Sequence, residues 1–534
     1  MLSDGELSII NGGFAGTCIG CPAALLCVFG VGAVGAGNLR CCHDLCTVSA
    51  QAKESVRVIC AAAMTVALVL TVYAFFSYDM SVGGMQFTED VPWIKDLGVH
   101  YALGVDGISL PMLLLTDLIG LAAVFSSWSI TERPKEFYIL LMILIAGVTG
   151  TFIARDLFIF LLCYEVVVIP IYIMVIIWGS TKRVSKEYAG MKLTIYLLMG
   201  SAFMLVGVVA LYLQAFPPEM RTFDMQALAA AAQAGHFSEE FQIFAFLLLL
   251  IGFGSLLSMF PFHSWSPDGY AGAPTAVSMI HAGVLKKIGG YGLIRLGLLV
   301  LPLGAKFWAP LIAGLAIINV MYAAYIALAQ HDLKYVIGYS SVSHMGYVLL
   351  GFAALNVVSV SGAVANMVAH GVMSALFFAM IGYVYERTHL RSVHELRGLA
   401  HQMPRVATGF MLAGMASLGL PGLIGFMPEF TIFVGSFGVY PVFAVIAISG
   451  IIFTALYTLR MLAKILFGPR DQRFDYFQDA KGVAMMPLII LGVALVGFGI
   501  FPQLLMGMVG SGTEQLVPLL DQLSDASAML GGVR

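Results

Sequence analysis

The chain has 534 residues, of which 60% are hydrophobic and only 11% are charged, and its formal net charge is −3. This composition excludes an ordinary soluble protein and gives no basic surface for nucleic acid, so it predicts a polytopic membrane protein. The opening stretch lacks a charged segment followed by a small-residue cleavage site, and we therefore expect no signal peptide.

Apolar stretches long enough to cross a bilayer recur about fourteen times along the chain, which predicts an all-α fold with about fourteen transmembrane helices. The predicted spans are 14–37, 56–77, 106–127, 137–154, 157–178, 190–214, 242–262, 274–299, 308–329, 334–355, 360–384, 404–432, 439–467 and 483–506.

Most of the eight cysteines lie between Cys18 and Cys46, spaced as C-x2-C and then CC-x3-C. Such spacing is also found in metal and iron–sulfur sites. Here the first three cysteines fall in an apolar run rich in Gly and Ala, and the others in a short polar loop. We therefore favour small apolar packing residues over a metal or cofactor site.

The distribution of Lys and Arg predicts the orientation of the chain. If both termini lie on the outer side, most of the 27 basic residues fall in cytoplasmic loops, whereas the outer loops are acidic.

Two predicted spans, the seventh and the twelfth, contain helix-breaking residues. They read "SMFPFHSWSPDGYAGAPT" (258–275) and "SLGLPGLIGFMPEF" (417–430). Proline removes a backbone donor and clashes with the preceding turn. Inside a membrane, such breaks persist only where the freed backbone is buried in protein or lines a wet cavity. Paired breaks are typical of transporters built from inverted repeats.

The breaks predict two inverted repeats of five helices each. "RDLFIFLLCYE" and "HDLKYVIGYSS" open the fifth and tenth helices and align Asp156 with Asp332. The predicted domains are 1–136 (helices 1–3), 137–299 (first repeat, helices 4–8), 308–467 (second repeat, helices 9–13) and 468–534 (helix 14 and a tail). In the tail, 513–530, four leucines share one helical face opposite acidic residues, which predicts an amphipathic helix on the outer surface or against a neighbouring subunit.

Glu165 lies near the middle of the apolar segment "DLFIFLLCYEVVVIPIYIMVIIWG", nine positions after Asp156. The helical rise places its carboxyl group roughly 13 Å deep, close to the bilayer midplane. Ionisable residues at this depth mark ion or proton pathways, although a hydrogen bond between helices is an alternative.

Lys286 and Lys287 lie within the predicted eighth helix, where a buried lysine can alternate between its charged and neutral forms. Adjacent residues point about 100° apart on a helix, so the two cannot face the same cavity. We expect one of them to extend to the bilayer surface or to pair with an acid. His281, six positions before Lys287, faces another direction, and both a relay role and a structural role stay open.

His344 and His370 lie in neighbouring predicted spans, and Glu429 follows Pro428 at the second break. Histidine titrates near physiological pH and suits proton transfer, although a lone buried histidine is more often a hydrogen-bonding group. Water and free backbone groups can reach Glu429 at the break. We therefore predict a proton relay that comprises Glu165, Lys287, Glu429, His344, His370 and His281, with Lys286 as a further member.

Motifs for nucleotide or metal cofactors are not found: the sequence contains no dinucleotide fingerprint before a helix, no phosphate-binding loop and no zinc quartet. The chain is therefore predicted to move charge without holding a redox centre.

Four segments resemble one family closely: "APTAVSMIHAGVLKKIGGYGLIRL", "HDLKYVIGYSSVSHMGYVLLG", "MVAHGVMSALFFAMIGYVYERTH" and "SLGLPGLIGFMPEFTIF". They resemble the antiporter-like M subunits of bacterial respiratory complex I, the NADH:quinone oxidoreductase, and the likeness runs from about residue 51 to 505. The resemblance implies a proton-translocating subunit of the inner membrane. It also implies L-, N- and K-type membrane partners, with FMN, iron–sulfur clusters and quinone on other subunits.

The resemblance also suggests roles for single residues. Glu165 corresponds to the helix-5 glutamate of the family, Lys287 to its helix-8 lysine and Glu429 to its helix-12 glutamate. His344 and His370 match histidines that are common in the family, and His281 resembles one in sister subunits.

One departure concerns helix 7, where the family carries a lysine that pairs with the helix-5 glutamate. The matching position is Leu256 in "IGFGSLLSMF", and no lysine occurs in 242–262. Lys286 is a possible substitute. Two alternatives remain: a subunit of an Mrp-type cation/proton antiporter, and a scaffold subunit that no longer conducts protons.

Overall fold

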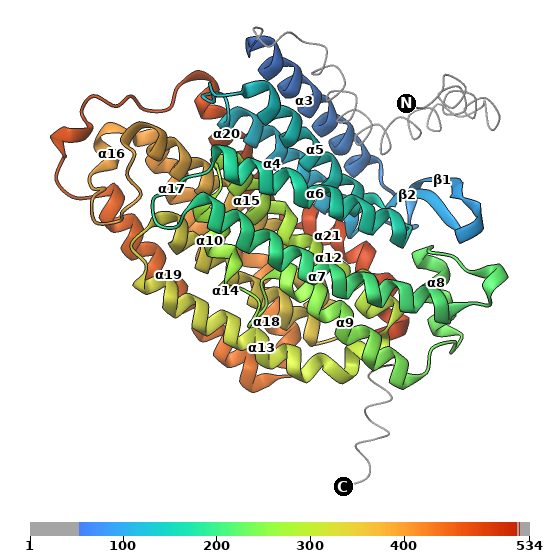
Figure 1. The fold of residues 1–534 in the computed structure, drawn as a ribbon. Coiled ribbons are helices and arrows are strands. Elements are labelled where there is room, and N and C mark those ends of the chain that lie inside the picture. The colour runs from blue at the N-terminus through green and yellow to red at the C-terminus, as the bar shows by residue number, and fades with distance from the viewer. Residues whose placement is uncertain (1–52, 521–522, 524–534) are drawn as a thin grey trace.

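The computed structural model describes residues 53–520 and 523 and consists almost entirely of helices (Figure 1). Within these residues, eleven helices are long and apolar enough to cross a membrane. They are α3 (Lys53–Ser77), α4 (Ser109–Ser126), α5 (Pro134–Ile153), α6 (Leu157–Trp178), α7 (Lys186–Ala215), α9 (Glu239–Leu257), α13 (Pro302–Ala329), α14 (Leu333–Ala353), α15 (Val357–Thr388), α19 (Pro441–Leu466) and α20 (Met486–Ile500). The predicted polytopic all-α fold is confirmed. The predicted span 14–37 and the cysteines from Cys18 to Cys46 lie outside the described residues, so the total of fourteen helices stays a prediction.

Shorter helices complete the described chain. They are α8 (Met225–Gln233), α10 (Trp265–Gly272), α11 (Thr275–Ile280), α12 (Lys286–Gly292), α16 (Leu399–Gln402), α17 (Pro404–Ser417), α18 (Phe426–Phe437) and α21 (Pro502–Thr513).

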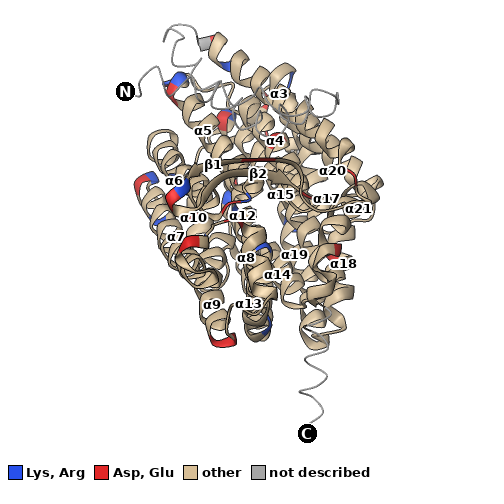
Figure 2. Cartoon of the chain, turned by 90° about the vertical axis from the view of Figure 1, so that its right-hand side faces the viewer, with Lys and Arg blue, Asp and Glu red and all other residues tan. Residues whose placement is uncertain are grey.

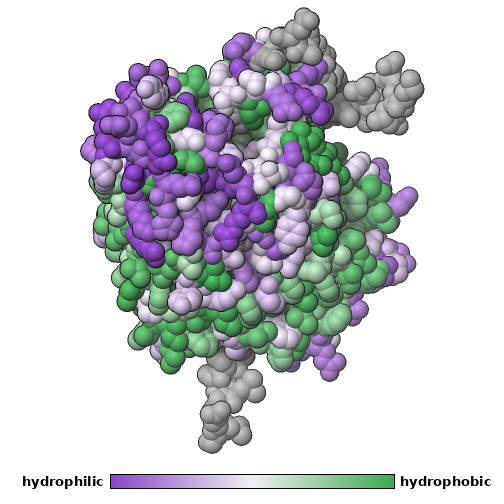
Figure 3. Space-filling model, turned by 60° about the vertical axis from the view of Figure 1, so that its left-hand side comes forward, coloured by the Kyte–Doolittle hydropathy of each residue, from purple (hydrophilic) through white to green (hydrophobic). Residues whose placement is uncertain are grey.

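The helices α14 and α15 form the centre of the bundle. In the apolar part of α15 all residues are buried, and in that of α14 94% of the residues are buried. In the apolar part of α19 only 33% of the residues are buried. The ribbon in Figure 2 is mostly neutral along the helices, and Figure 3 shows a broad hydrophobic belt below a hydrophilic region. Polar side chains on α14 and α15 are therefore held far from water.

A β-hairpin, which the sequence analysis did not predict, interrupts the helical pattern and projects from one side of the bundle (Figure 1). Its strands, β1 (Gln86–Ile94) and β2 (Val99–Val105), are antiparallel. The backbone N–H of His100 donates to the Asp156 carboxylate at 3.0 Å, which ties the hairpin to the start of α6. Its register is irregular and the burial of its residues does not alternate, which explains why the sequence pattern did not reveal it.

The predicted eighth span is a helical run over residues 275–298, in which α11 and α12 alternate with two π-helical segments, His281–Leu285 and Leu293–Leu298. Short π-helical turns are frequent at functional sites. Lys286 and Lys287 directly follow the first of them.

The break in the seventh span lies between α9 and α10, as predicted. Asn319 on α13 stabilises it: its Oδ1 accepts from the Phe260 N–H at 2.7 Å, and its Nδ2 donates to the Ser258 carbonyl at 3.1 Å. Buried backbone groups freed by a break need such partners.

The break in the twelfth span lies between α17 and α18, also as predicted. Gly419 and Gly422 have φ angles of +65° and +90° in this connection. Glycine adopts such angles at little cost, which allows the chain to reverse within a short segment.

The same local arrangement occurs twice in the chain. Asp156 caps the start of α6 and Asp332 caps the start of α14 with their side chains. Backbone hydrogen bonds join the segment before α6 to residues 223–225, after α7, and the segment before α14 to residues 391–393, after α15. This recurrence agrees with two repeats, whose boundaries and inversion stay predictions.

The predicted amphipathic tail is described in part. The side chains of its four leucines are buried against the rest of the protein. They are Leu516, Leu519, Leu520 and Leu523. Lys306 Nζ donates to the Leu523 carbonyl at 2.6 Å, which ties the tail to α13.

We expect Asn319→Ala to destabilise the protein, because it leaves the Phe260 N–H and the Ser258 carbonyl without partners. Each buried unsatisfied group costs about 1–3 kcal/mol, so the melting temperature in detergent should fall clearly. Gln503→Ala, at an exposed amide, is the matched control. An equal melting temperature for both variants would show that Asn319 does not stabilise the break.

Candidate functional site

Four ionisable side chains lie in a row through the centre of the bundle. Lys287 Nζ is 2.8 Å from His370 Nδ1, and the rings of His370 and His344 have centroids 5.5 Å apart. His344 Nδ1 is 3.2 Å from Glu429 Oε1. We call this row the Lys287–Glu429 network. It joins four separate segments: α12, α15, α14 and α18.

The network is shielded from solvent. Lys287, His370 and His344 are no more than 2% exposed, and the Glu429 side chain is 6% exposed. A buried charge is costly unless neighbouring groups pair with it or hydrogen-bond to it. Lys287 also donates to the Ala282 carbonyl, within the π-helical segment of its own helix. The Lys287 ammonium group and one nitrogen of each histidine therefore have partners, whereas the Nε2 atoms of His344 and His370 have none among the described residues.

The two ends of the network differ in their surroundings. Lys287 is enclosed by helices, whereas Glu429 borders an apolar recess of about 610 Å³ at the second break, lined by Leu418, Gly419, Phe430 and Phe433 among others. A proton that reaches Glu429 is therefore closer to the molecular surface than one at Lys287.

Like charges on neighbouring members of the network repel one another. Lys287, His370 and His344 all become cations when protonated, and Glu429 is the one acid in the row. Like charges a few ångströms apart in a low-dielectric interior repel strongly. Protonation of one member thus favours release from the next.

Lys286 points away from Lys287, as its helical position predicts. Its Nζ lies 3.2 Å from Ser266 Oγ and 3.1 Å from Ser341 Oγ, and 5.6 Å from the centre of the Tyr270 ring. The expectation that one lysine reaches the surface or pairs with an acid is wrong. Both are fully buried, and two hydroxyl groups and an aromatic face stabilise Lys286 where it lies.

His281 lies outside the network. Its ring packs against Trp265, with centroids 5.0 Å apart, and against Tyr270 at 5.4 Å. Neither ring nitrogen has a hydrogen-bond partner among the described residues. His281 and Lys286 both contact the Tyr270 ring, so His281 belongs to the surroundings of that lysine.

Glu165 is not joined to the network either. It lies half-buried on α6, in one outward-facing stripe with the exposed side chains of Leu162, Val166 and Ile169. No described residue forms a hydrogen bond or an ion pair with Glu165. The structure therefore places it on a face open to lipid or to a neighbouring chain, and not beside the buried lysines.

Comparison with known proteins places the chain in a family. Residues 154–454 match the family model described as "NADH:quinone oxidoreductase/Mrp antiporter, TM". The chain belongs to this antiporter-like family. Chain 4 of the NAD(P)H-quinone oxidoreductase of Acaryochloris marina is 36% identical over 460 residues, which cover 84% of each protein. The resemblance to complex I antiporter-like subunits is thereby confirmed.

Solved structures share the fold. A chain of respiratory complex I from Thermus thermophilus with bound NADH superposes with a TM-score of 0.80 at 25% identity, over 92% of this chain and 99% of that one. A chain of the Mrp complex from Dietzia sp. DQ12-45-1b gives a TM-score of 0.79 at 20% identity, over 94% and 98% of the two chains. The latter likeness concerns the fold alone.

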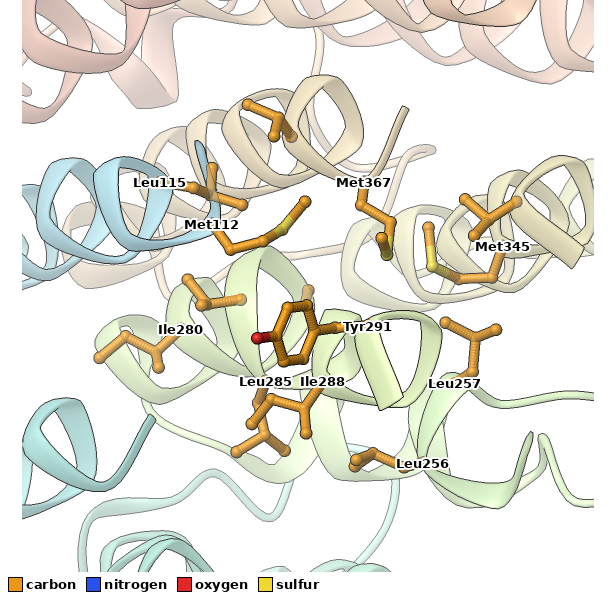
Figure 4. Packing of buried hydrophobic residues seen from close by; sticks show 14 of the residues in the cluster. Met112, Leu115, Leu256, Leu257, Ile280, Leu285, Ile288, Tyr291, Met345 and Met367 are labelled. Atoms are coloured by element: carbon orange, nitrogen blue, oxygen red, sulfur yellow. The ribbon is translucent and has the colours of Figure 1, made fainter. Parts of the chain in front are cut away.

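Leu256, at the position where the resemblance implies a helix-7 lysine, is part of the apolar core. It is 1% exposed, and Figure 4 shows it with Leu257 and Ile288 among other buried apolar side chains. A leucine here needs no polar partner. Lys286, another buried lysine of this region, contacts the broken seventh helix through Ser266.

Sequence reasoning missed Lys334, which is 3% exposed. Its Nζ donates to the carbonyls of Tyr270 at 3.2 Å and Ala273 at 2.6 Å, and to Ser278 Oγ at 3.3 Å. A cation at the C-terminal end of α10 offsets the partial negative charge of the helix end. Its place two residues after the cap Asp332, at the start of an apolar span, is a signal that could have revealed it.

An ion pair at the first break was also missed. Lys192 Nζ lies 2.7 Å from Asp268 Oδ2, and the Tyr335 hydroxyl donates to Asp268 Oδ1 at 2.7 Å. The carboxylate lies in the predicted break, but its lysine partner is 76 positions away. Another ion pair, Arg295 with Asp106, is buried and lies at the C-terminal end of the helical run over residues 275–298.

Proposed function

We propose that this chain is a proton-translocating membrane-arm subunit of an NADH:quinone oxidoreductase, which couples quinone reduction on other subunits to proton pumping. The observation that carries the proposal is the Lys287–Glu429 network, a buried row of titratable groups. Lys287–His370 and His344–Glu429 are within hydrogen-bond distance, and the two histidine rings lie 5.5 Å apart between their centroids. The identity of 36% to a chain of an NAD(P)H-quinone oxidoreductase supports the assignment to that complex.

We propose that the proton moves along the network from Lys287 to Glu429. A proton enters from the cytoplasmic side and loads Lys287. Lys287 passes it to His370, with which it is already in hydrogen-bonding contact. Histidine can accept a proton at one ring nitrogen and release one from the other, so His370 and His344 carry it onward. Glu429 receives it at the second break and releases it to the outer side.

The energy of one step is within reach of this arrangement. Moving one charge against 100 mV costs about 2.3 kcal/mol. Two unit charges about 4 Å apart interact by about 4 kcal/mol at an effective dielectric constant of 20. A shift in the charge state of one neighbour can therefore drive a proton past the membrane potential.

Lys286 is the neighbour best placed to receive such a signal. It is adjacent to Lys287 in sequence, and it contacts Ser266 on α10 and Ser341 on α14. A movement of the broken seventh helix would change the stabilisation of the Lys286 charge. The altered repulsion would then act on Lys287. In this proposal Lys286 takes the role of the helix-7 lysine that the resemblance implies at the position of Leu256.

Glu165 and the partner subunits complete the proposal. The exposed stripe around Glu165 faces a neighbouring antiporter-like subunit of the L or N type, and Glu165 couples the two relays. A K-type chain, FMN, iron–sulfur clusters and quinone belong to other subunits. The complex lies in a bacterial inner membrane, with both termini of this chain on the outer side.

Two other functions fit less well. A chain of the Mrp complex shares the fold at 20% sequence identity. The relative from Acaryochloris marina, at 36% identity, is a chain of an NAD(P)H-quinone oxidoreductase. A scaffold without conduction is suggested by Leu256. It gives no reason for a lysine, two histidines and a glutamate to lie in contact inside the bundle.

The assignment to the complex can be tested by affinity purification of the tagged chain in mild detergent. We expect flavin, iron–sulfur centres and NADH:quinone activity to co-purify with it. Recovery of the chain with apolar antiporter-like chains only, without flavin or iron, would favour the Mrp-type function and overturn the redox assignment.

Lys287→Met removes the first group of the network while it preserves most of the side-chain volume. We expect proton transfer through this chain to slow about 100-fold, the low end of what one positioned proton donor contributes. The measurement is proton uptake by liposomes that contain the purified complex, followed with a pH-sensitive dye during quinone reduction. Lys182→Met, at an exposed lysine, is the control. Uptake equal to the control would contradict the relay.

A further inference from the structure

Four basic side chains meet where the end of α19 approaches the α13–α14 junction and the loop after α15. His394 Nε2 lies 2.8 Å from His331 Nδ1, and Lys464 Nζ lies 3.4 Å from His394 Nδ1. Arg460, one turn before Lys464 on α19, donates to the Leu328 carbonyl at 3.4 Å. We call His331, His394, Arg460 and Lys464 the basic cluster. They line a shallow surface depression.

The positive charge of the basic cluster is not neutralised within the described chain. None of its members forms an ion pair with a carboxylate there, and the nearby Asp332 is paired with Arg391 at 3.2 Å. The pKa of His394 is lowered, first because of the Lys464 ammonium group, then by desolvation and by the charges of His331 and Arg460. The groups that act on His394 therefore repel its proton.

Several other basic residues at the same end of the bundle are paired with carboxylates. Arg397 and Arg473 both contact the Asp471 carboxylate, at 3.2 and 2.8 Å, and Arg470 contacts Asp475 at 2.8 Å. Unlike these residues, the four members of the basic cluster lie together without a carboxylate partner in the described chain. An anion from outside the chain would supply the missing charge.

An apolar stripe leads directly to the basic cluster. Ile452 and Leu456 precede Arg460 at intervals of four residues on α19, so they lie on the same helix face. They are 68% and 55% exposed, and Tyr325 on the adjoining α13 is 68% exposed. We call Ile452, Leu456, Leu459 and Tyr325 the apolar stripe. Figure 3, which brings forward the left-hand side of Figure 1, shows a hydrophilic region bordering a hydrophobic belt in this way.

We infer that the basic cluster and the apolar stripe together bind an anionic phospholipid. Its phosphate contacts Arg460, Lys464 and the two histidines, and its acyl chains lie along α13 and α19. Hydrogen bonds from cationic donors to phosphate are among the strongest in proteins. Basic pockets between transmembrane helices bind anionic head groups, and a nearby Tyr suits the membrane interface. A free phosphate would use the cluster but not the stripe, which is why we assign a lipid.

The test uses the full-length chain, purified with its accompanying subunits, in nanodiscs of phosphatidylcholine with increasing phosphatidylglycerol. A diazirine on the acyl chain crosslinks bound lipid, and mass spectrometry locates the labelled peptides. We expect phosphatidylglycerol to label peptides of α13 and α19 in preference to phosphatidylcholine. Arg460→Gln with Lys464→Gln should shift the titration about thirtyfold, at about 1 kcal/mol per basic residue.

The matched control is Lys182→Gln with Lys481→Gln, which removes two exposed lysines at loops outside the basic cluster. It should label like the unchanged protein. Equal labelling by both lipids, or an unchanged titration in the Arg460/Lys464 variant, would overturn the proposal. Displacement of the label by inorganic phosphate would show a free-phosphate site instead. Absence of lipid labels on α13 and α19 would show that another subunit covers this face, and would also overturn it.

Discussion

An ionisable group inside a bilayer is stable only where protein groups replace the water that it has lost. This requirement explains much of the structure. Lys287, His370, His344 and Glu429 satisfy it by contacting one another, and Lys286 satisfies it with two serine hydroxyl groups and an aromatic ring. In the proposed relay, the groups that stabilise one another are also the groups that pass the proton.

The broken helices and π-helical turns follow from the same requirement. A regular helix uses all of its backbone groups internally, whereas a break frees carbonyls and N–H groups for other partners. Lys334 uses the carbonyls at the end of α10, and Lys287 uses the Ala282 carbonyl in a π-helical segment. Asn319 forms hydrogen bonds to the backbone N–H of Phe260 and the carbonyl of Ser258, which no charged side chain contacts. Each irregular segment is thus tied to a buried polar residue.

Local signals in the sequence could predict part of this arrangement. Proline and glycine located both helix breaks, and single charged residues in apolar spans identified Lys287 and Glu429. The contacts themselves could not be predicted, because Lys287 and His370 are 83 positions apart and meet only through packing. The outward orientation of the Glu165 side chain could not be predicted for another reason. The helix α6 is apolar on all sides, so its sequence does not distinguish the face toward the bundle from the face toward lipid. The β-hairpin was missed because its register is irregular and its burial does not alternate along the strands.

The central claim is that protons pass along the Lys287–Glu429 network, and His344 is its middle link. The most direct measurement is the number of protons pumped per quinone reduced by the reconstituted complex with His344→Leu, with His236→Leu, at an exposed histidine outside the network, as the control. The account predicts a lower ratio for His344→Leu and an unchanged ratio for His236→Leu. A ratio for His344→Leu equal to that of the unchanged complex would contradict it.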